Sequence, residues 1–525
     1  MKIISTSEMR RVETLAIQQG LSAAEMMGNA AAGIARIVVR EISQISGEVL
    51  ILGLAGKGNN GGDCLLTLEM LAKLGYQAAG LTFGRENPND TSHGQAQSGG
   101  VERIEATPGT IDGWFSQHTD EKIIFVDGLL GTGFSGKLSV AASQVLKRIR
   151  ENLANCATMV VAVDCPSGIN CDSGEVSEET LRADITVCLA ACKAGLLKEP
   201  ALAFTGQLEL VEIGLDAVMQ DWLAALDDVI TPRVIANLIP YRSPFSHKGS
   251  FGKVLVAGGC QKYAGALSLC LQAALRVGVG LVTGACSEQV MNRLTAALPD
   301  VTWQPLAGNT AGQLNQQAAR SLLDQAGTYS AMAIGPGLGV SEDTNGFMKQ
   351  FITSCASETG IPLVFDADGL KCLAEIPEWC RHLSREVVLT PHPGEMALLT
   401  GLPIREIQAD RIEICRKFAN LWQKVVVLKG SGTVVSTPDG KVWVSPVATS
   451  ALAHAGSGDV LTGIIAGYLA QGLSAREAAV LGVGLHAKCA QVAVNEPGCE
   501  DSVLASDLVR CIPAAIAQLR EIKSR

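Results

Sequence analysis

The sequence has 525 residues, a formal net charge of −10, and 47% hydrophobic but only 4% aromatic residues. This length and hydrophobic fraction predict a globular protein with more than one core, and the acidic balance argues against nucleic acid or an anionic membrane surface as the main partner. The 16 cysteines form no CxxC pair and have no ligand spacing with the seven histidines, so we expect reduced thiols in a cytoplasmic protein.

The amino-terminal segment MKIISTSEMRRVETLAIQQG predicts an amphipathic helix that begins at Ser7 with Glu8 behind it. The segment is polar and lacks the apolar core of a signal peptide. Farther along the chain, no apolar run reaches the ~18 residues that span a bilayer. We therefore expect no membrane partner.

The next predicted elements meet at a glycine-rich loop. Glu48–Ala55 has the pattern of a buried strand, LAGKGNNGGDC follows over Leu54–Cys64, and CLLTLEMLAKLG has apolar residues at helical spacing. Where a strand ends and a helix begins, free backbone N–H groups favour an anion such as phosphate. A tight turn that needs glycine only for its shape explains the same residues equally well. The loop alone leaves both interpretations open.

Strand-like runs that end in glycine or aspartate recur along the chain. KIIFVDGLLGTGFSGK, ATMVVAVDCPSGIN and ADITVCLAACKAG follow the first loop, and a second series runs from GKVLVAGGC to HAGSGDVLTG. Prolines interrupt the pattern between Gln220 and Pro244. We therefore predict an α/β protein with two doubly wound domains, 1–220 and 221–525, with the boundary near Asp216 to Thr231, in place of the three domains that length suggests.

A candidate phosphoryl-transfer site lies in the second half, where AGSGD precedes a long apolar helix. Backbone N–H groups at the helix start can bind a phosphoryl group, and the carboxylate of Asp459 can take a proton from an attacking hydroxyl. A GxGD sequence alone is a weak signal, because Gly-Asp pairs often only turn a chain. The loop VVVLKGSGT, whose Lys429 lies about 30 residues upstream, strengthens it. Together the two motifs resemble the ribokinase-like superfamily, in which GxGD forms the anion hole and carries the catalytic base.

Further motifs of the second half closely resemble the ADP- or ATP-dependent NAD(P)H-hydrate dehydratases. They are YAGA over Tyr263–Ala266, IGPGLG with Gly335, Gly337 and Gly339, VFDADGL, and TPHPGEM with His392 and Glu395. The resemblance implies that Asp459 is catalytic and that Mg²⁺ accompanies ADP or ATP as co-substrate. The implied substrate contacts are Ala266, Gly337, His392 and Asp459. The implied nucleotide contacts are Lys429, Gly430, Ser431, Gly432, Thr433 and Gly458.

The first half resembles the NAD(P)H-hydrate epimerase domains, a Rossmann-like family with the motifs NNGGDG, VDxxxGTG and VDxPSG. Here they occur as Asn59–Asp63, as Asp127 with Gly131–Gly133, and as Asp164 with Pro166–Gly168. The resemblance implies that Asp164 moves protons between the R and S hydrates, whereas a turn-capping aspartate is the simpler alternative. It implies a potassium ion held by Asn60, Asp127 and Ser167. Substrate contacts are implied for Asp164 and for Asn59, Asn60, Gly61, Gly62, Asp63, Gly131, Thr132, Gly133, Phe134, Ser135, Gly136 and Lys137.

The two resemblances cover nearly the whole chain and imply a bifunctional repair enzyme. It would epimerise hydrated NADH and NADPH (NADHX and NADPHX) and dehydrate the S form, with ADP favoured over ATP by resemblance. We also expect a homo-oligomer. Two alternatives remain: a ribokinase-like small-molecule kinase with a non-catalytic amino-terminal module, or an amino-terminal domain that serves in dimerisation or RNA binding.

Two positions depart from the family pattern. Cys64 stands where the epimerase motif has a final glycine, and His454 lies in ATSALAHAGSGD, where the dehydratases have an Asn-containing GNPG-like turn. Because a side chain at Cys64 would intrude on a bare backbone, we expect these changes to affect the tightness of binding more than the chemistry.

Overall fold

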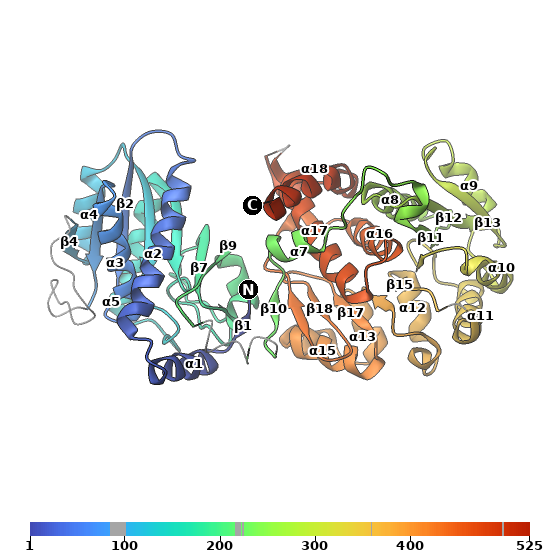
Figure 1. Ribbon diagram of the computed structural model, residues 1–525, viewed down its shortest axis with the longest axis horizontal. Helices are drawn as coiled ribbons and strands as arrows, with labels where there is room; N and C mark the ends of the chain where they lie inside the picture. Colours follow the sequence, from blue (N-terminus) through green and yellow to red (C-terminus); the bar gives the residue numbers. More distant parts are fainter. Residues whose placement is uncertain (85–100, 216–221, 223–224, 359, 496–497, 525) are drawn as a thin grey trace. The chain divides into compact units, whose positions relative to one another are not determined.

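The computed structural model describes residues 1–84, 101–215, 222, 225–358, 360–495 and 498–524. The chain forms two compact units, Met1–Val229 and Ile230–Arg525 (Figure 1). The boundary predicted between residues 220 and 221 lies outside the described residues. Each unit has its own sheet and its own helices, which confirms the predicted α/β fold class.

A parallel sheet forms the centre of the first unit. Its strands lie in the order β4-β3-β2-β5-β6-β7-β9, and every neighbouring pair is parallel. The strand order reverses between β2 and β5, which is where open α/β sheets bind ligands. The strands are β2 (Val49–Ala55), β3 (Ala78–Thr82), β4 (Glu102–Glu105), β5 (Lys122–Gly128), β6 (Ala157–Val163), β7 (Ile185–Leu189) and β9 (Gln207–Val211).

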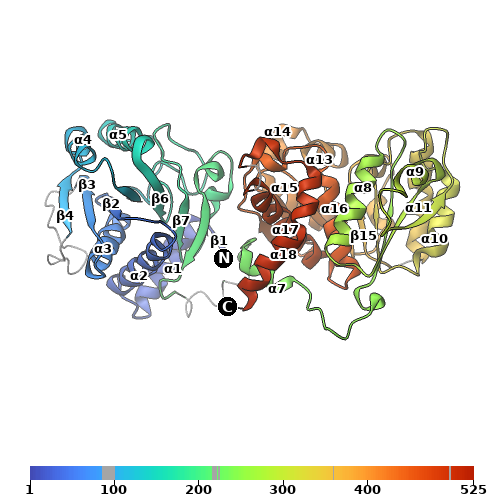
Figure 2. The same ribbon diagram turned by 90° about the horizontal axis from the view of Figure 1, so that it is seen from above.

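Two apolar cores cover the two faces of this sheet. One contains side chains of α1 (Thr6–Gln18), α2 (Ala23–Ile42) and α3 (Asn59–Lys73), and the other contains side chains of α4 (Pro108–Gln117) and α5 (Val140–Cys156). Figure 2 shows the strands between these two groups of helices. The inner strands β2, β3, β5 and β7 are buried and read as nearly continuous apolar runs, as the sequence pattern indicated, whereas the edge strands β4 and β9 are partly exposed.

The first helix begins at Thr6, one position before the predicted Ser7. Ser5 is the cap of α1: its hydroxyl accepts from the Glu8 backbone N–H, and the Glu8 carboxylate accepts from the Ser5 N–H at 3.1 Å. This reciprocal capping box satisfies two N–H groups, which a start at Ser7 would not do. Before it, β1 (Ile3–Ile4) pairs in parallel with β8 (Cys192–Lys193).

The second unit has a larger, mixed sheet. Its strands lie in the order β19-β18-β17-β16-β15-β14-β11-β12-β13, parallel from β17 to β13 and antiparallel between β17, β18 and β19. The strands are β11 (Lys253–Ala257), β12 (Leu281–Ser287), β13 (Thr302–Leu306), β14 (Ala331–Ile334), β15 (Leu363–Phe365), β16 (Val387–Leu389), β17 (Val425–Leu428), β18 (Val434–Ser436) and β19 (Val442–Val444); the two-residue β10 (Asp228–Val229) precedes them.

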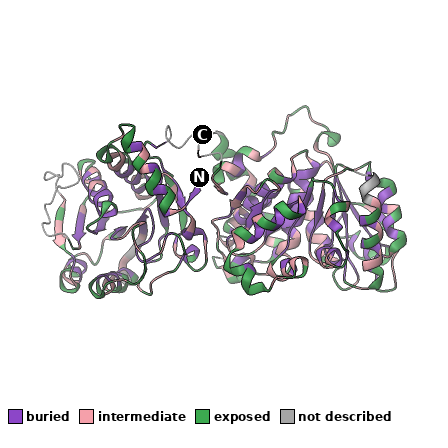
Figure 3. Ribbon diagram, turned by 90° about the horizontal axis from the view of Figure 1, so that it is seen from below, coloured by how far each residue is buried: buried purple, intermediate pink, exposed green. Residues whose placement is uncertain are grey.

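Helices α7, α8, α16, α17 and α18 share one large apolar core with strands of this sheet. Figure 3 shows the strands buried and the outer helix faces exposed. None of the helices in the described ranges has the length and apolar character that a bilayer crossing requires. The helices are α7 (Pro232–Leu238), α8 (Ala264–Arg276), α9 (Glu288–Leu294), α10 (Gln316–Ala326), α11 (Glu342–Glu358), α12 (Asp368–Ala374), α13 (Pro393–Thr400), α14 (Ile404–Ala409), α15 (Arg411–Trp422), α16 (Ser457–Ala470), α17 (Ala475–Asn495) and α18 (Ala505–Ser524).

Candidate active sites

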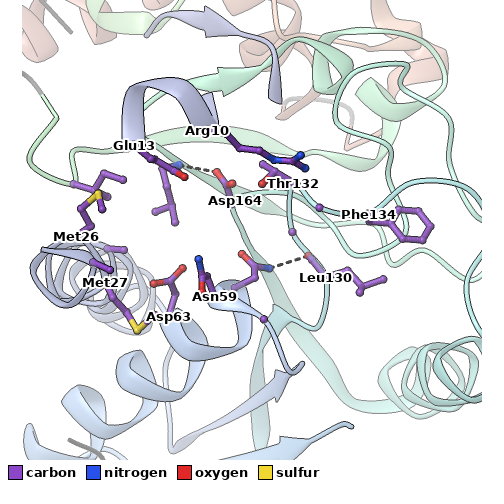
Figure 4. Close-up of a pocket in the computed structure, with 18 of the residues that line it drawn as sticks. Arg10, Glu13, Met26, Met27, Asn59, Asp63, Leu130, Thr132, Phe134 and Asp164 are labelled. Carbon is purple, nitrogen blue, oxygen red and sulfur yellow. Dashed lines mark hydrogen bonds between the residues drawn. The ribbon is translucent and has the colours of Figure 1, made fainter. Parts of the chain in front are cut away.

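A cavity of about 1020 Å³ lies at the carboxyl ends of β2, β5 and β6 in the first unit. Figure 4 shows side chains of α1, α2 and α3 and of the loop after β5 around it. The predicted contacts Gly61, Gly62, Gly136 and Lys137 do not line this cavity. The predicted residues that do line it are Asn59, Asn60, Asp63, Gly131, Thr132, Gly133, Phe134, Ser135 and Asp164.

The glycine-rich loop over Leu54–Cys64 leads into α3: Gly58 is the cap of this helix, and Gly61 and Gly62 lie in its first turn. Gly58 is the cap without a side-chain hydrogen bond, so backbone N–H groups of the first turn remain available to a ligand. Gly61 does not have positive φ; a Cβ there would lie 1.9 Å from the Gly56 carbonyl oxygen. The expected intrusion of Cys64 is wrong, because its side chain is fully buried with Sγ 3.7 Å from the Val126 carbonyl, in the core.

Asp164 follows β6 directly and is held by several contacts. It is one of the few non-glycine residues with positive φ, at 64°, and its backbone N–H donates to the Val187 carbonyl at 2.9 Å. Its Oδ1 accepts from the Leu189 N–H at 3.0 Å and from Nζ of Lys193. Lys193 is 1% exposed. Burial is the largest influence and acts to lower the pKa of Lys193, but the charges of Asp164 and Cys188 and the hydrogen bond to Asp164 together outweigh it and raise that pKa.

Two further carboxyl groups face the same cavity. Asp63 is 7% exposed, and no side-chain hydrogen bond or ion pair to it occurs among the described residues. Burial, followed by the charges of Asp164 and Glu13, raises the pKa of Asp63 well above its ordinary value. Burial likewise raises the pKa of Glu13, against the opposing charge of Lys193. The cavity therefore combines one carboxylate paired with lysine and carboxyl groups that retain protons more strongly.

The residues predicted to hold potassium lie together beneath the loop after β5. The fully buried Asp127 accepts from the Ser167 hydroxyl at 2.6 Å and from its backbone N–H at 2.8 Å. The Ser167 hydroxyl accepts from the Leu130 N–H at 2.9 Å, and Asn60 donates to the Leu130 carbonyl at 2.8 Å. Burial raises the pKa of Asp127 although these hydrogen bonds oppose it. A buried carboxylate with hydroxyl, amide and carbonyl oxygens around it fits a hard cation.

In the second unit, the predicted residues gather at the carboxyl ends of parallel strands. Lys429 follows β17, and its Nζ lies 2.6 Å from Oδ1 of Asp366, which follows β15. Asp366 is 1% exposed and also accepts from the hydroxyls of Thr390 at 2.8 Å and Thr462 at 2.7 Å. A Cβ at Gly458 would lie 3.3 Å from Nζ of Lys429. This places a lysine charge beside the start of α16.

Asp459 lies in the first turn of α16, whose cap is Gly456 with φ of 94°. Burial, followed by the charge of Asp366, raises the pKa of Asp459 to about 7, while Lys429 acts to lower it. A carboxyl group with this pKa exchanges protons near neutral pH. The arrangement therefore combines a carboxyl group that can act as a general base with a helix start that can accept a phosphoryl group.

The other predicted residues of this unit lie on neighbouring loops. His392 caps α13, and its Nδ1 accepts from the Gly394 and Glu395 N–H groups at 3.0 and 3.2 Å. Burial lowers the pKa of His392. The Lys429 N–H donates to the Pro391 carbonyl, which joins the two loops. Gly430 and Gly432 have positive φ, and Thr433 closes the Lys429–Thr433 loop by donating to the Gly430 carbonyl at 2.8 Å.

Gly337 has no space for a side chain. Its φ is 64°, and a Cβ there would lie 2.3 Å from the Tyr263 carbonyl oxygen and 3.1 Å from Cβ of Ala266. The structure therefore brings together the IGPGLG and YAGA loops that the sequence motifs singled out.

Sequence reasoning did not single out four charged residues of these sites. Arg10 and Glu13 come from α1, and Lys193 and Asp366 are a buried lysine and a buried aspartate. For the last two a signal was present in the sequence: Lys193 interrupts the apolar run AACKAG, and Asp366 follows VF in VFDADGL. A charged residue within an apolar run favours a buried, paired group. For α1 no local pattern shows that it reaches the cavity.

The two units thus form a two-domain α/β enzyme in which each domain presents its own set of ionisable groups at the carboxyl ends of its strands. Residues 23–195 match the family model for the YjeF-related protein amino terminus, and residues 254–514 match the model for NAD(P)H-hydrate dehydratase.

Full-length relatives carry both domains. The chain is 34% identical over 99% of its length to the bifunctional NAD(P)H-hydrate repair enzyme Nnr of Moorella thermoacetica, covering 98% of that protein. It is 30% identical to that of Thermofilum pendens, covering 99% of this chain and 97% of the relative. The solved ADP/ATP-dependent NAD(P)H-hydrate dehydratase of Bacillus subtilis, co-crystallised with ATP/Mg²⁺, is 32% identical with a TM-score of 0.49, over 56% of this chain and 99% of that chain.

The chain belongs to the bifunctional NAD(P)H-hydrate repair enzymes. It combines an amino-terminal epimerase domain and a carboxyl-terminal, ribokinase-like dehydratase domain, as the sequence motifs predicted.

Proposed function

We propose that the cavity of the first unit interconverts the R and S hydrates of NADH and NADPH and that Asp164 is the proton carrier. The observation that carries this assignment is that Asp164 lies in the cavity wall. Its Oδ1 accepts a hydrogen bond from the Leu189 N–H, and the residue still faces the cavity. The free N–H groups at the start of α3 bind the substrate phosphates, since that helix end has no side-chain cap. This supports the phosphate-binding interpretation of the glycine-rich loop over Leu54–Cys64 against that of a purely structural turn.

The epimerisation balances with one proton carrier. Asp164 takes the proton of the C6 hydroxyl, the C6–N1 bond breaks with its electron pair on N1, and N1 receives the proton. The resulting aldehyde group rotates, and N1 attacks the opposite face of C6. The proton of N1 then returns through Asp164 to the oxygen. Asn60, Asp127 and Ser167 would hold a potassium ion, which supplies positive charge that offsets the buried carboxylate and the substrate phosphates.

In the second unit, Asp459 takes the proton of the C6 hydroxyl of the S hydrate, and the oxygen attacks the terminal phosphoryl group of ADP or ATP. The bond from that phosphorus to the bridging oxygen breaks, and AMP or ADP leaves with the electron pair. The N–H groups at Gly458 and the charge of Lys429 stabilise the transferring phosphoryl group. Loss of the C5 proton and departure of phosphate then restore the C5=C6 double bond. Mg²⁺ bound with the nucleotide supplies charge neutralisation. Ala266, Gly337 and His392 contact the hydrate, and the Lys429–Thr433 loop contacts the nucleotide.

A reciprocal pair of variants tests this division. Asp164→Ala should leave the S hydrate fully repairable while the R hydrate is consumed only at the spontaneous rate. Asp459→Asn should slow dehydration about 100-fold or more and leave the rate of R–S exchange unchanged. Absorbance at 340 nm and nuclear magnetic resonance of the hydrates measure the two reactions. Loss of both reactions in either variant would contradict the assignment.

Substrate choice, assembly and location complete the proposal. We propose ADP as the preferred phosphoryl donor, a homo-oligomeric assembly and a cytoplasmic location, in line with the acidic charge and the free cysteines. Light scattering measures the assembly, and NADH yield with ADP and ATP supplied in turn measures the donor. Accumulation of a stable phosphorylated product without NADH would favour the small-molecule kinase instead.

A further inference from the structure

The buried ammonium group of Lys193 makes three specific contacts. Its Nζ donates to Oδ1 of Asp164, to the Leu189 carbonyl at 3.0 Å and to the Ala191 carbonyl at 3.1 Å. An ammonium group has three N–H donors, so all of them are used within the protein. Lys193 therefore has no donor left for the substrate, although it lies in the cavity wall.

The contacts of Asp164 are divided between its two oxygens. Oδ1 accepts from Lys193 and from the Leu189 N–H at 3.0 Å. For Oδ2, no hydrogen-bond donor occurs among the described residues. Because φ of Asp164 lies in the left-handed region, its backbone conformation also depends on the surrounding contacts.

We propose that Lys193 is a positioning residue of the epimerase domain: it fixes Oδ1 of Asp164 so that Oδ2 is the oxygen that moves the proton. This inference rests on the proposed role of Asp164. Without the ammonium group, the carboxyl group would rotate and both oxygens would share the contact with the Leu189 N–H. The loss would affect the rate of proton movement rather than the affinity for the hydrate.

The charges around the pair agree with this role. Glu13 and Asp63 face the cavity from α1 and α3, as Asp164 does from the end of β6 (Figure 4). The charge of Lys193 acts on both Glu13 and Asp63, so three carboxyl groups share one buried lysine. The other two cations in the wall, Arg10 and Lys57, are exposed. A permanently charged Lys193 thus compensates Asp164 selectively, through a direct contact that the other two carboxyl groups lack among the described residues.

The test uses the full-length chain and R–S exchange measured by nuclear magnetic resonance. Lys193→Met should lower kcat about 10- to 100-fold and leave KM within about twofold. Lys198→Met is the matched control, because Lys198 also donates to a backbone carbonyl, that of Asp172 at 2.9 Å, outside the cavity. Lys193→Arg keeps the charge and should fold, but its planar guanidinium cannot reproduce the three contacts, so kcat should still fall. Wild-type kcat in Lys193→Arg and Lys193→Met would overturn the proposal.

A double-mutant cycle separates positioning from general stabilisation. In an Asp164→Asn background, Lys193→Met should cause no further loss of kcat, because the lysine acts through the aspartate. NADPH binding, measured by calorimetry, reports whether the first unit is folded in each variant. If the factor by which kcat falls in the double variant equals the product of the factors in the two single variants, the proposal is overturned. Wild-type exchange in Asp164→Asn alone would instead overturn the proposed function of Asp164.

Discussion

Nζ of Lys429 lies 2.6 Å from Oδ1 of Asp366, and the hydroxyls of Thr390 and Thr462 occupy the remaining sides of that carboxylate. Asp366 is nearly inaccessible, so its charge acts on its neighbours with little screening. It directs the lysine toward Gly458 and at the same time raises the pKa of Asp459. One buried carboxylate thus influences both the cation and the general base of the proposed dehydratase site.

Replacing Asp366 should destabilise the second unit. Asp366→Ala removes the nearest acceptor of the half-buried ammonium of Lys429, which keeps only the more distant Glu395 at 3.7 Å, and an acceptor of two hydroxyls. Removal of one partner of a buried ion pair costs about 3–5 kcal/mol. The thermal unfolding midpoint of the full chain, followed by loss of dehydratase activity, measures the effect. Asp324→Ala on the exposed face of α10 is the control and should change little. Equal midpoints for the two variants would contradict this prediction.

The rate of dehydration should depend on pH near neutrality. A general base must be unprotonated, and the pKa of Asp459 is about 7, so kcat should rise with pH through that value and level off above it. In Lys429→Met the cation that lowers this pKa is absent, so the rising limb should move to higher pH. A profile of kcat against pH at saturating hydrate and nucleotide checks both statements, and an unchanged limb in Lys429→Met would be inconsistent with them.

Substitution of Gly61 should affect folding more than phosphate affinity. A Cβ at Gly61 would lie 1.9 Å from the Gly56 carbonyl oxygen, a backbone atom that cannot move aside. Gly61→Ala should therefore cost about 1–3 kcal/mol in the first unit. Gly58→Ala is the matched comparison, since no atom lies within 4 Å of its added Cβ. Thermal unfolding followed by a probe in the first unit measures both, and similar stability of the two variants would count against the prediction.

Asp63→Asn should stabilise the first unit at alkaline pH. Burial raises the pKa of Asp63 in the folded chain, so its stability contribution is present at acidic pH and is lost as the pH rises through the folded-state pKa. Asparagine removes this loss, and the two proteins should approach equal stability in acid. Unfolding midpoints across pH test the sign; a variant that is less stable than wild type only at alkaline pH would reverse it.

Epimerisation should depend on potassium. Replacing K⁺ by tetramethylammonium, which is too large for the Asn60, Asp127 and Ser167 oxygens, should slow R–S exchange while dehydration of the S hydrate is retained. Asp127→Asn should weaken the response to added K⁺. If R–S exchange is equally fast in both salts, no potassium ion acts at this site and the prediction is wrong.

The motifs predicted which strand ends carry functional groups because each motif is a short, local sequence at a strand-to-helix junction. Asp164, Asp459 and Lys429 all follow strands or begin helices as expected. Their roles stay predictions. The local pattern could not show why Gly61 is glycine, since the atom that excludes a side chain belongs to Gly56 on the preceding turn.

Long-range contacts account for what the sequence could not predict. Lys193 reaches Asp164 across 29 residues, and Asp366 reaches Lys429 across 63. Neither separation along the chain corresponds to a helical or strand period, so no sequence pattern indicates that these residues pair. The helix α1 lies outside the residues that match the amino-terminal family model, yet it supplies Arg10 and Glu13 to the cavity wall.

The pairing of β1 with β8 has a consequence for biosynthesis. Ile4 lies opposite Lys193 in that small sheet, so during synthesis Ile3 and Ile4 find their partners only after nearly two hundred more residues have been made. Because synthesis adds about 5–20 residues per second, β1 stays unpaired for roughly 10–40 s before it can pair with β8. Nascent chains arrested shortly before β8 should therefore leave β1 open to protease, and those arrested well beyond it should protect it.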